Sequence, residues 1–355
     1  MGAPAASPPG ATPKQRVTVA FDALGAEAGS GAVAAGVRAA AADGIAVRVH
    51  GPVAEYGGLA SDLIEIVDAT EVIGNDEEPV RAVRTRPDAS IVRAAADVAA
   101  GRADALASPG STGATMTAAL LALKRIRSIQ RPALAVELPA PGRERPLLML
   151  DVGANADARP SHLVQFAYLG AAFAGAVLGV EAPRVRLLSV GAEAKKGSAA
   201  VVEAHAALRG ADGIDFAGNV EGRELLDPDA DVVVSDGFTG NVVLKTIEGT
   251  ARAVGDAVGQ AARSGPLAAA GGLLLRPALG GLRAELDPDR TGGAILLGLR
   301  GVAVVGHGSA GSLGIAGQIR LAARAARERA VDRTAALVAE SGAGRGAIRE
   351  SRARS

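Results

Sequence analysis

The segment DALASPGSTGATM, residues 104–116, joins a short apolar strand to a Gly-rich loop and then to the first turn of a helix. The same order recurs in VTVAFDALG at 17–25, PLLMLDVGAN at 146–155 and DVVVSDGFTGN at 231–241. Strands that alternate with helices and end in polar Gly-rich loops predict an α/β fold with a parallel sheet. Because ligands bind at the carboxyl ends of parallel strands, we expect these loops to meet at one edge of the sheet.

The remaining pattern predicts a single domain over 17–340, between a disordered Pro/Ala/Gly tail at 1–16 and a flexible tail at 341–355. Further strand-and-loop segments are expected at 45–51, 63–69, 184–197, 214–222 and 301–311. Helices are expected at 32–42, 90–101, 112–125, 160–179, 198–208 and 242–262, and a long Ala/Arg helix closes the chain.

Composition excludes several classes of protein. The 355 residues contain no Cys, which removes disulfide scaffolds, thiolate metal sites and a cysteine nucleophile. Lys+Arg and Asp+Glu are equal at 38 each and aromatic residues make up 2%, so a nucleic-acid partner is not expected. The sequence shows neither a targeting segment nor an uninterrupted apolar run of the roughly 18–20 residues that a spanning helix needs. We expect a cytoplasmic protein.

The loop at 108–113 is the best candidate for an anion site. Its glycines free the backbone, its hydroxyls can donate, and the helix that follows directs N–H groups toward it. It lacks the GK[ST] of a Walker A loop, and no GxGxxG follows the first strand. An ordinary helix cap at Ser111 or Thr112 explains the same residues equally well.

Lysine and histidine point to other loops. Only five lysines occur, and Lys195 and Lys196 form a pair in a strand-end loop, which suggests a need for a compact ammonium group. Lys245 follows Asn241 by one helical turn, so both could face the same site. His307 lies between glycines after a strand and is the histidine best placed to act in a site. Structural roles are expected for the other histidines: His50, His162 and His205. HxxxH, HExxH and GxSxG spacings are absent, so neither a zinc site nor a hydrolase elbow is predicted.

Six blocks of sequence resemble one enzyme family as a set. They are DEEPVRAVR at 76–84, SPGSTGATMTAALLALKRIRSIQRPALA at 108–135, LLMLDVGANADARPSHLVQFAYLG at 147–170, PRVRLLSVGAEAKKG at 183–197, DFAGNVEGRELL at 215–226 and DVVVSDGFTGNVVLKTIEG at 231–249. They look like the signature blocks of the acyl-carrier-protein-dependent phosphate acyltransferases, the PlsX family.

The resemblance implies an enzyme that moves a fatty acyl group from acyl carrier protein to inorganic phosphate, giving acyl phosphate for phospholipid synthesis without a cofactor. It implies a Rossmann-like three-layer α/β sandwich related to isocitrate and isopropylmalate dehydrogenases, with a protruding helical hairpin. It further implies a homodimer at the periphery of the cytoplasmic membrane. A glycerol-3-phosphate acyltransferase that uses acyl phosphate is then expected as a further partner.

A mechanism compatible with these residues has phosphate attack the thioester directly, since phosphate is substantially dianionic near neutral pH. The 108–113 loop and Lys196 would hold phosphate, Asn241 would donate to the developing oxyanion, and His307 or Lys195 would assist the leaving thiolate. Asp22, Asp151 and Asp236 are expected to hold loops, because unpaired carboxylates repel phosphate. The full set expected to bind substrate or phosphate is Asp22, Ser108, Gly110, Ser111, Thr112, Gly113, Asp151, Asn155, Asn219, Asp236 and Gly237.

Two surfaces are assigned less firmly. The segment GPLAAAGGLLLRPALGGLR at 265–283 is either a buried hairpin tip or an exposed apolar tip that contacts the membrane through Leu273, Leu274 and Leu275. An acidic carrier protein would need an arginine patch. The candidates for that patch are two groups: Arg81, Arg84, Arg86 and Arg93, or Arg125 and Arg127.

Two other functions remain open. The first and last loops, DALGAEAG and HGSAG, differ from the family pattern, which suggests the first alternative, and the Asp22, Asp151 and Asp236 loops on a related fold suggest the second. One is a membrane-associated scaffold that binds carrier protein without turnover. The other is a decarboxylating dehydrogenase that uses a nicotinamide and a divalent metal.

Overall fold

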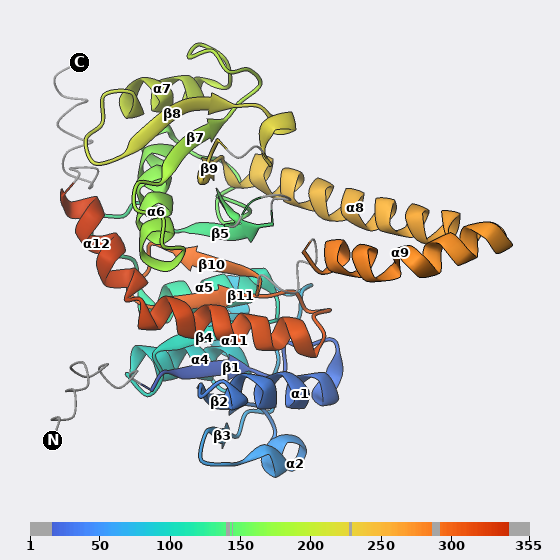
Figure 1. Cartoon of the computed structure of the whole chain (residues 1–355). Coiled ribbons are helices and arrows are strands. Elements are labelled where there is room, and N and C mark those ends of the chain that lie inside the picture. The colour runs from blue at the N-terminus through green and yellow to red at the C-terminus, as the bar shows by residue number, and fades with distance from the viewer. Residues whose placement is uncertain (1–15, 140–142, 144, 227–228, 286–291, 341–355) are drawn as a thin grey trace, which may run out of the picture.

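A computed structural model describes residues 16–139, 143, 145–226, 229–285 and 292–340, and in these residues a single sheet contains eleven strands (Figure 1). The strands are β1 (Thr18–Asp22), β2 (Ala46–His50), β3 (Ile64–Val67), β4 (Ala105–Ser108), β5 (Ala133–Leu138), β6 (Leu147–Leu150), β7 (Arg184–Leu188), β8 (Asp215–Val220), β9 (Val232–Val234), β10 (Ala294–Leu297) and β11 (Val302–Val305). Their order across the sheet is β3-β2-β1-β4-β11-β10-β5-β6-β9-β7-β8. The tails expected at 1–16 and 341–355 lie outside the described residues, apart from Arg16.

The sheet is mainly parallel, as predicted, but it reverses direction in the middle. β10 pairs antiparallel with both β11 and β5, and β5 pairs antiparallel with β6. β1, β2, β3, β4 and β11 therefore run one way, whereas β6, β7, β8 and β9 run the other. The expectation that every strand-end loop leaves one edge is wrong, because the sequence pattern did not reveal β5 and β10.

Helices cover both faces and complete the three-layer sandwich. They are α1 (Gly29–Ala42), α2 (Val53–Tyr56), α3 (Pro79–Thr85), α4 (Ser90–Ala99), α5 (Thr112–Leu123), α6 (Pro160–Val177), α7 (Ala199–Leu208), α8 (Gly237–Ala261), α9 (Pro266–Glu285), α11 (Ser312–Arg327) and α12 (Ala330–Glu340). Short 3₁₀ turns lie at Gly57–Leu59 and Gly222–Glu224. The long closing helix expected from the sequence is two helices, α11 and α12, separated where Arg329 adopts a φ of 52°.

Alternating side chains along the strands contribute to two separate apolar clusters. In β1, Val19 and Phe21 join the cluster that includes α1, α6 and α11, whereas Ala20 joins the cluster formed with α4 and α5. This period of two is the expected pattern for a strand buried on both faces. The core is built mainly from Ala, Val, Leu and Ile, with Phe21, Phe166, Tyr168 and Phe173 as its largest buried side chains.

The helices α8 and α9 form a hairpin that extends away from the body of the molecule (Figure 1). Leu273, Leu274 and Leu275 lie in the middle of α9 and are 67%, 83% and 57% exposed. The buried-tip alternative is therefore wrong. The turn of the hairpin lies at 262–265, and α9 continues through Pro277, where the sequence had suggested a break.

Candidate active site

Asp22, at the end of β1, organises a first cluster of polar loops. Its buried carboxylate accepts hydrogen bonds from Ser90 Oγ at 2.5 Å and Ser108 Oγ at 2.8 Å. Burial raises the pKa of Asp22, although both hydroxyl donors lower it in part. Ser108 Oγ also accepts from Gly110 N–H at 3.1 Å and from Thr115 Oγ1 at 3.0 Å. Asp22 and Ser108 therefore hold the shape of the 108–113 loop from beneath.

A pocket of about 360 Å³ opens above this cluster. It is lined by Gly25 and Glu27 after β1, by Gly110, Ser111 and Thr112 at the start of α5, and by His307 after β11, among others. The first two loops touch, since a Cβ on Gly25 would lie 2.5 Å from Gly110 Cα. Ser111 caps α5 and Gly113 lies in its first turn, so the helix directs its N-terminal N–H groups and positive dipole end toward the pocket.

Asp151 organises a second cluster at the end of β6. Its Oδ1 accepts N–H hydrogen bonds from Leu134 at 3.0 Å, Gly153 at 3.2 Å and Ala154 at 2.8 Å. Its Oδ2 accepts from the backbone N–H and the side-chain amide of Asn155, at 2.8 and 2.7 Å. Burial raises the pKa of Asp151, and these donors lower it in part. The carboxylate is saturated with protein donors, as expected for a group that holds a loop.

The start of α8 packs against the second cluster. Asp236 caps the helix by accepting from Thr239 N–H and Thr239 Oγ1, each at 2.8 Å. Gly237 N–H donates to Asn155 O at 2.7 Å. A Cβ on Gly240 would lie only 1.9 Å from the carbonyl oxygen of Asp151, so this contact requires glycine.

Asn241 lies in the first turns of α8 beside the Asp151 loop. The loop predicted at 236–241 is instead the N-cap and the beginning of the helix, because the Asp236 cap starts the helix at Gly237. The Asn241 amide oxygen is 3.8 Å from where a Cβ of Gly153 would stand. The predicted oxyanion donor therefore faces the glycine-containing turn that follows Asp151.

The helix α8 connects the two clusters. Lys245 Nζ donates to Glu248 Oε2 at 2.8 Å, and Glu248 Oε1 lies 3.5 Å from His307 Nε2 in the first cluster. Burial alone would raise the pKa of Glu248, but hydrogen bonds and charges from His307 and Lys245 lower it to about 2. Asn241 and Glu248 are separated by about 10 Å along the helix at 1.5 Å per residue. The candidate site therefore extends along one side of the first turns of α8.

The loop that carries Lys195 and Lys196 forms a third element. Both lysines are exposed, and in the described part of the chain no hydrogen bond or ion pair joins their side chains to either cluster. Asn219 is buried beneath the loop, where it donates to Glu193 O at 3.0 Å and contacts His205 Nδ1 through its amide oxygen at 2.9 Å. Asn219 therefore positions the lysine loop, and the structural role expected for His205 is confirmed.

Two residues of the candidate site, Ser90 and Glu248, were not predicted from the sequence. The sequence predicts only that Ser90 begins a helix. Its hydrogen bond to Asp22 depends on packing between segments that are distant in the sequence. Glu248 follows Lys245 by three residues and Asn241 by seven, a spacing that places all three near one side of a helix. The sequence shows that spacing, but it does not show that Glu248 contacts His307.

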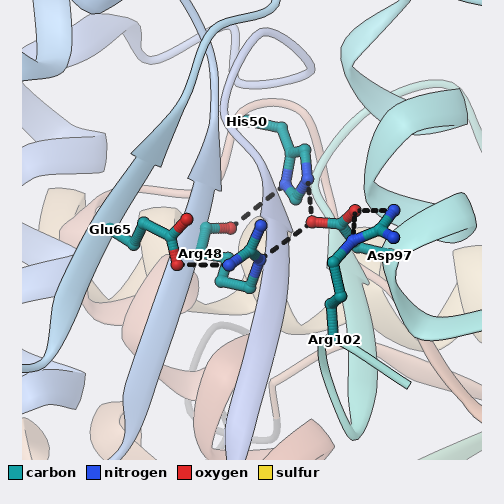
Figure 2. A network of polar contacts seen from close by, with 5 residues as sticks. All are labelled: Arg48, His50, Glu65, Asp97 and Arg102. Atoms are coloured by element: carbon teal, nitrogen blue, oxygen red, sulfur yellow. Dashed lines mark hydrogen bonds and ion pairs between the residues drawn. The ribbon is translucent and has the colours of Figure 1, made fainter. Parts of the chain in front are cut away.

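A further polar network joins β2 to β3 and α4 (Figure 2). Asp97 Oδ2 accepts from Arg48 Nε at 2.8 Å and lies 3.0 Å from His50 Nε2, and Asp97 Oδ1 accepts from Arg102 Nε at 2.7 Å. Arg48 also pairs with Glu65. Burial lowers the pKa of His50 while Asp97 raises it in part. His50 is thus a buried, hydrogen-bonded residue, as expected.

Within the described residues no group of three or more His, Cys, Asp or Glu side chains is arranged to hold a metal ion. No helix among them is long and apolar enough to cross a membrane.

Solved structures share the fold. A EutD phosphotransacetylase from Staphylococcus aureus matches 88% of this chain and 95% of its own, with a TM-score of 0.56 and 18% identity. A 4-hydroxythreonine-4-phosphate dehydrogenase from Klebsiella pneumoniae matches 88% and 100%, with a TM-score of 0.52 and 16% identity. These likenesses confirm a dehydrogenase-like α/β fold.

Relatives by sequence place the chain among the phosphate acyltransferases, a class of acyltransferase. A phosphate acyltransferase from Anaeromyxobacter dehalogenans strain 2CP-1 is 43% identical over 330 residues, 91% of each chain. One from Leuconostoc citreum strain KM20 is 41% identical over 311 residues, 85% of this chain and 89% of the relative. The chain belongs to the fatty acid synthesis protein family, whose model matches residues 17–333. The relatives favour acyl transfer over a dehydrogenase or an inactive scaffold.

Proposed function

We propose that this acyltransferase moves a fatty acyl group from acyl carrier protein to inorganic phosphate and so supplies acyl phosphate for phospholipid synthesis. The observation that carries the proposal is the pocket at the N-terminus of α5, together with the contact through α8 to a second loop cluster. A site of this shape has one place for an anion in the pocket and another, along α8, for a second reactant.

Phosphate occupies the pocket beside Gly110, Ser111 and Thr112. Backbone N–H groups at the start of α5 donate to its oxygens, and the helix dipole favours its charge. His307 lines the same pocket. We assign Lys196 to phosphate as well; it lies in the loop after β7, the parallel neighbour of β9, so this loop leaves the sheet at the same edge as Asn241.

In the reaction a phosphate oxygen attacks the thioester carbonyl carbon, a new C–O bond forms and the C–S bond breaks. The electron pair of the broken bond leaves on the carrier thiolate, which takes up a proton from His307 or Lys195. Asn241 donates to the carbonyl oxygen as negative charge develops, a contribution of about 3–4 kcal/mol for an oxyanion donor of this kind. Glu248 holds His307 by its Nε2 atom.

The decisive experiment incubates the full chain with acyl-acyl carrier protein and phosphate and traps acyl phosphate with hydroxylamine. Wild type should give phosphate-dependent acyl hydroxamate. Asn241→Ala should lower kcat by about 10²–10³, and Lys196→Ala should raise KM for phosphate. Wild-type acyl-phosphate formation in both variants would reject these roles.

The two other functions predict different results. A scaffold would bind carrier protein without any phosphate-dependent loss of thioester. A dehydrogenase would reduce NAD in the presence of a hydroxy acid, which the absorbance of the reduced cofactor reveals.

The enzyme acts as a homodimer at the cytoplasmic membrane surface in this proposal. The exposed leucines of α9 support membrane contact, because an apolar surface on a protruding element marks an interaction site. A glycerol-3-phosphate acyltransferase in the same membrane would then consume the acyl phosphate.

A further inference from the structure

Five cationic side chains form a surface that the proposed reaction does not use. Lys124, Arg127, Arg131, Arg159 and Arg300 are all exposed. Among the described residues none of them forms an ion pair, whereas Arg48, Arg86, Arg184 and Arg324 are all paired with carboxylates. We call these five residues the basic surface. Its charge is therefore not offset by ion pairs in the part of the chain that the structure describes.

The segment between α5 and β5 carries most of the basic surface and is firmly held at one end. Arg300 N–H donates to Lys124 O at 2.9 Å, and Arg300 Nε donates to Arg125 O at 3.1 Å. Ile126 N–H donates to Gly298 O at 3.0 Å. These bonds fix Lys124 and Arg300 beside each other.

The other end of the same segment is held by α6. Gln130 N–H donates to Gln165 Oε1 at 2.8 Å, and Gln165 Nε2 donates to Ser128 O at 2.9 Å. Arg159 is the N-cap of α6, and the helix dipole adds positive potential there. Burial lowers the pKa of His162, and the charges of Arg131 and Arg159 lower it further, so both guanidinium groups lie near one imidazole.

A pocket of about 370 Å³ marks the Lys124 end of the basic surface. Lys124 and Arg300 line it together with Asp104, whose Oδ2 accepts from Thr18 N–H at 2.8 Å. It offers a recess for an acidic side chain of a partner.

In the alternative arginine group on α3 and α4, two of the four arginines are paired with carboxylates. Arg86 Nη2 lies 2.6 Å from Glu77 Oε2, and Arg93 Nη1 lies 3.8 Å from Asp88 Oδ1. Glu78 caps α3 by accepting from Arg81 N–H at 2.7 Å. Nearby carboxylates therefore offset much of the positive charge around α3.

The basic surface adjoins the candidate active site. Arg131 is followed by Pro132, whose carbonyl accepts from Asn155 Nδ2 at 2.8 Å. Asn155 belongs to the Asp151 loop, and that loop contacts Asn241. A partner on the basic surface would therefore lie next to the proposed thioester end of the site.

We propose that the basic surface docks the acidic carrier protein that delivers the acyl group, a proposal that rests on the proposed function. The recognition is by charge: an acidic helical face of the carrier lies against Arg127, Arg131 and Arg159, and an acidic side chain enters the Lys124 recess. Complementary charge of this kind speeds encounter and fixes orientation, and it weakens as salt rises.

The test is the double charge reversal Arg127→Glu/Arg131→Glu, with Arg81→Glu/Arg84→Glu on α3 as the matched control. Acyl-phosphate formation is measured with acyl-acyl carrier protein and, separately, with an acyl thioester of pantetheine that has no protein. We expect KM for the acyl carrier substrate to rise about tenfold in the Arg127/Arg131 variant, as for loss of steering charges. Its kcat and its turnover of the small thioester should stay at wild-type values, and the control should stay near wild type with both substrates.

Direct binding separates this proposal from the proposed function. If wild type produced no acyl phosphate from either thioester, the proposed function would fail, and fluorescence anisotropy of labelled carrier protein would still measure docking. Tenfold weaker carrier binding in the Arg127/Arg131 variant supports docking. Unchanged KM and unchanged carrier binding overturn it, as does an equal loss with the small thioester. Loss of binding to anionic phospholipid vesicles with unchanged carrier binding would assign the surface to the membrane instead.

Discussion

Glu248 shows how a single residue joins parts of the chain that are far apart in sequence. It lies on α8, yet one carboxylate oxygen accepts from Lys245 of the same helix and the other faces His307 after β11. Hydrogen bonds and charges from Lys245 and His307 outweigh the cost of partial burial, and the pKa of Glu248 falls to about 2. The carboxylate is therefore ionised whenever the enzyme is folded near neutral pH.

This lowered pKa predicts a pH-dependent stability. A carboxylate whose pKa is lower in the folded state stabilises the fold above its unfolded pKa, and the stabilisation disappears as pH falls toward the folded value. Glu248→Gln should therefore unfold more easily than wild type at pH 7, and the difference should shrink from about pH 4.5 down to about pH 2. Urea unfolding at a series of pH values measures it.

The control for this experiment is Glu203→Gln on α7, an exposed glutamate without an ion pair among the described residues. It should change the free energy of unfolding little at pH 7. A Glu248→Gln difference that stays constant down to pH 3 would contradict the assigned ion pairs.

At the scale of elements, the start of α8 determines where Asn241 stands. The helix begins against the Asp151 loop only because Gly240 has no Cβ, which would lie 1.9 Å from the Asp151 carbonyl oxygen. The loop itself is held by the saturated Asp151 carboxylate. Strand β6, its loop and the helix therefore form one packed unit that sets the distance between Asn241 and Gly153.

Gly240→Ala should destabilise the protein by about 1–3 kcal/mol, because the added methyl group forces backbone apart in a packed region. It should also lower kcat for acyl-phosphate formation, since Asn241 moves with the helix. Gly249→Ala in the same helix is the control, because a Cβ there has nothing within 4 Å. That substitution should stabilise the helix by about 0.5–1 kcal/mol. Equal thermal melting of the two variants would disprove the close packing.

At the scale of the whole molecule, the α8–α9 hairpin is both a part of the site and an extension from it (Figure 1). The base of α8 carries Asn241, Lys245 and Glu248, and α9 returns with exposed leucines. The two helices of the hairpin thus link the candidate site to the surface that we assign to the membrane.

Replacing Leu273, Leu274 and Leu275 with Asp should abolish binding to phospholipid vesicles in a flotation assay, because burial of this apolar area is the driving force. Circular dichroism and thermal melting should remain close to wild type, since all three side chains are exposed. Vesicle binding that survives the triple substitution would show that α9 is not the membrane contact.

Much of the fold could be predicted because local sequence patterns indicate its strands, loops and helices. The strands that end in Asp22, Ser108, Asp151 and Asp236 were recognised from apolar runs followed by polar Gly-rich loops. The loop-holding role of the aspartates also followed from simple electrostatics, and the hydrogen bonds confirm it. The roles of Lys196, Asn241 and His307 in the reaction stay predictions.

The rest required tertiary structure, for a physical reason. The strands at 133–138 and 294–297 are apolar runs without polar loops, and such runs do not show which way they pair. These two strands reverse the sheet, so its loops form separate clusters that α8 reconnects through Glu248 and His307. The sequence by itself determined the repeated strand–loop–helix units and the chemistry at their ends. Only the tertiary structure decided which ends meet, because strand pairing and helix packing join residues through space rather than along the chain.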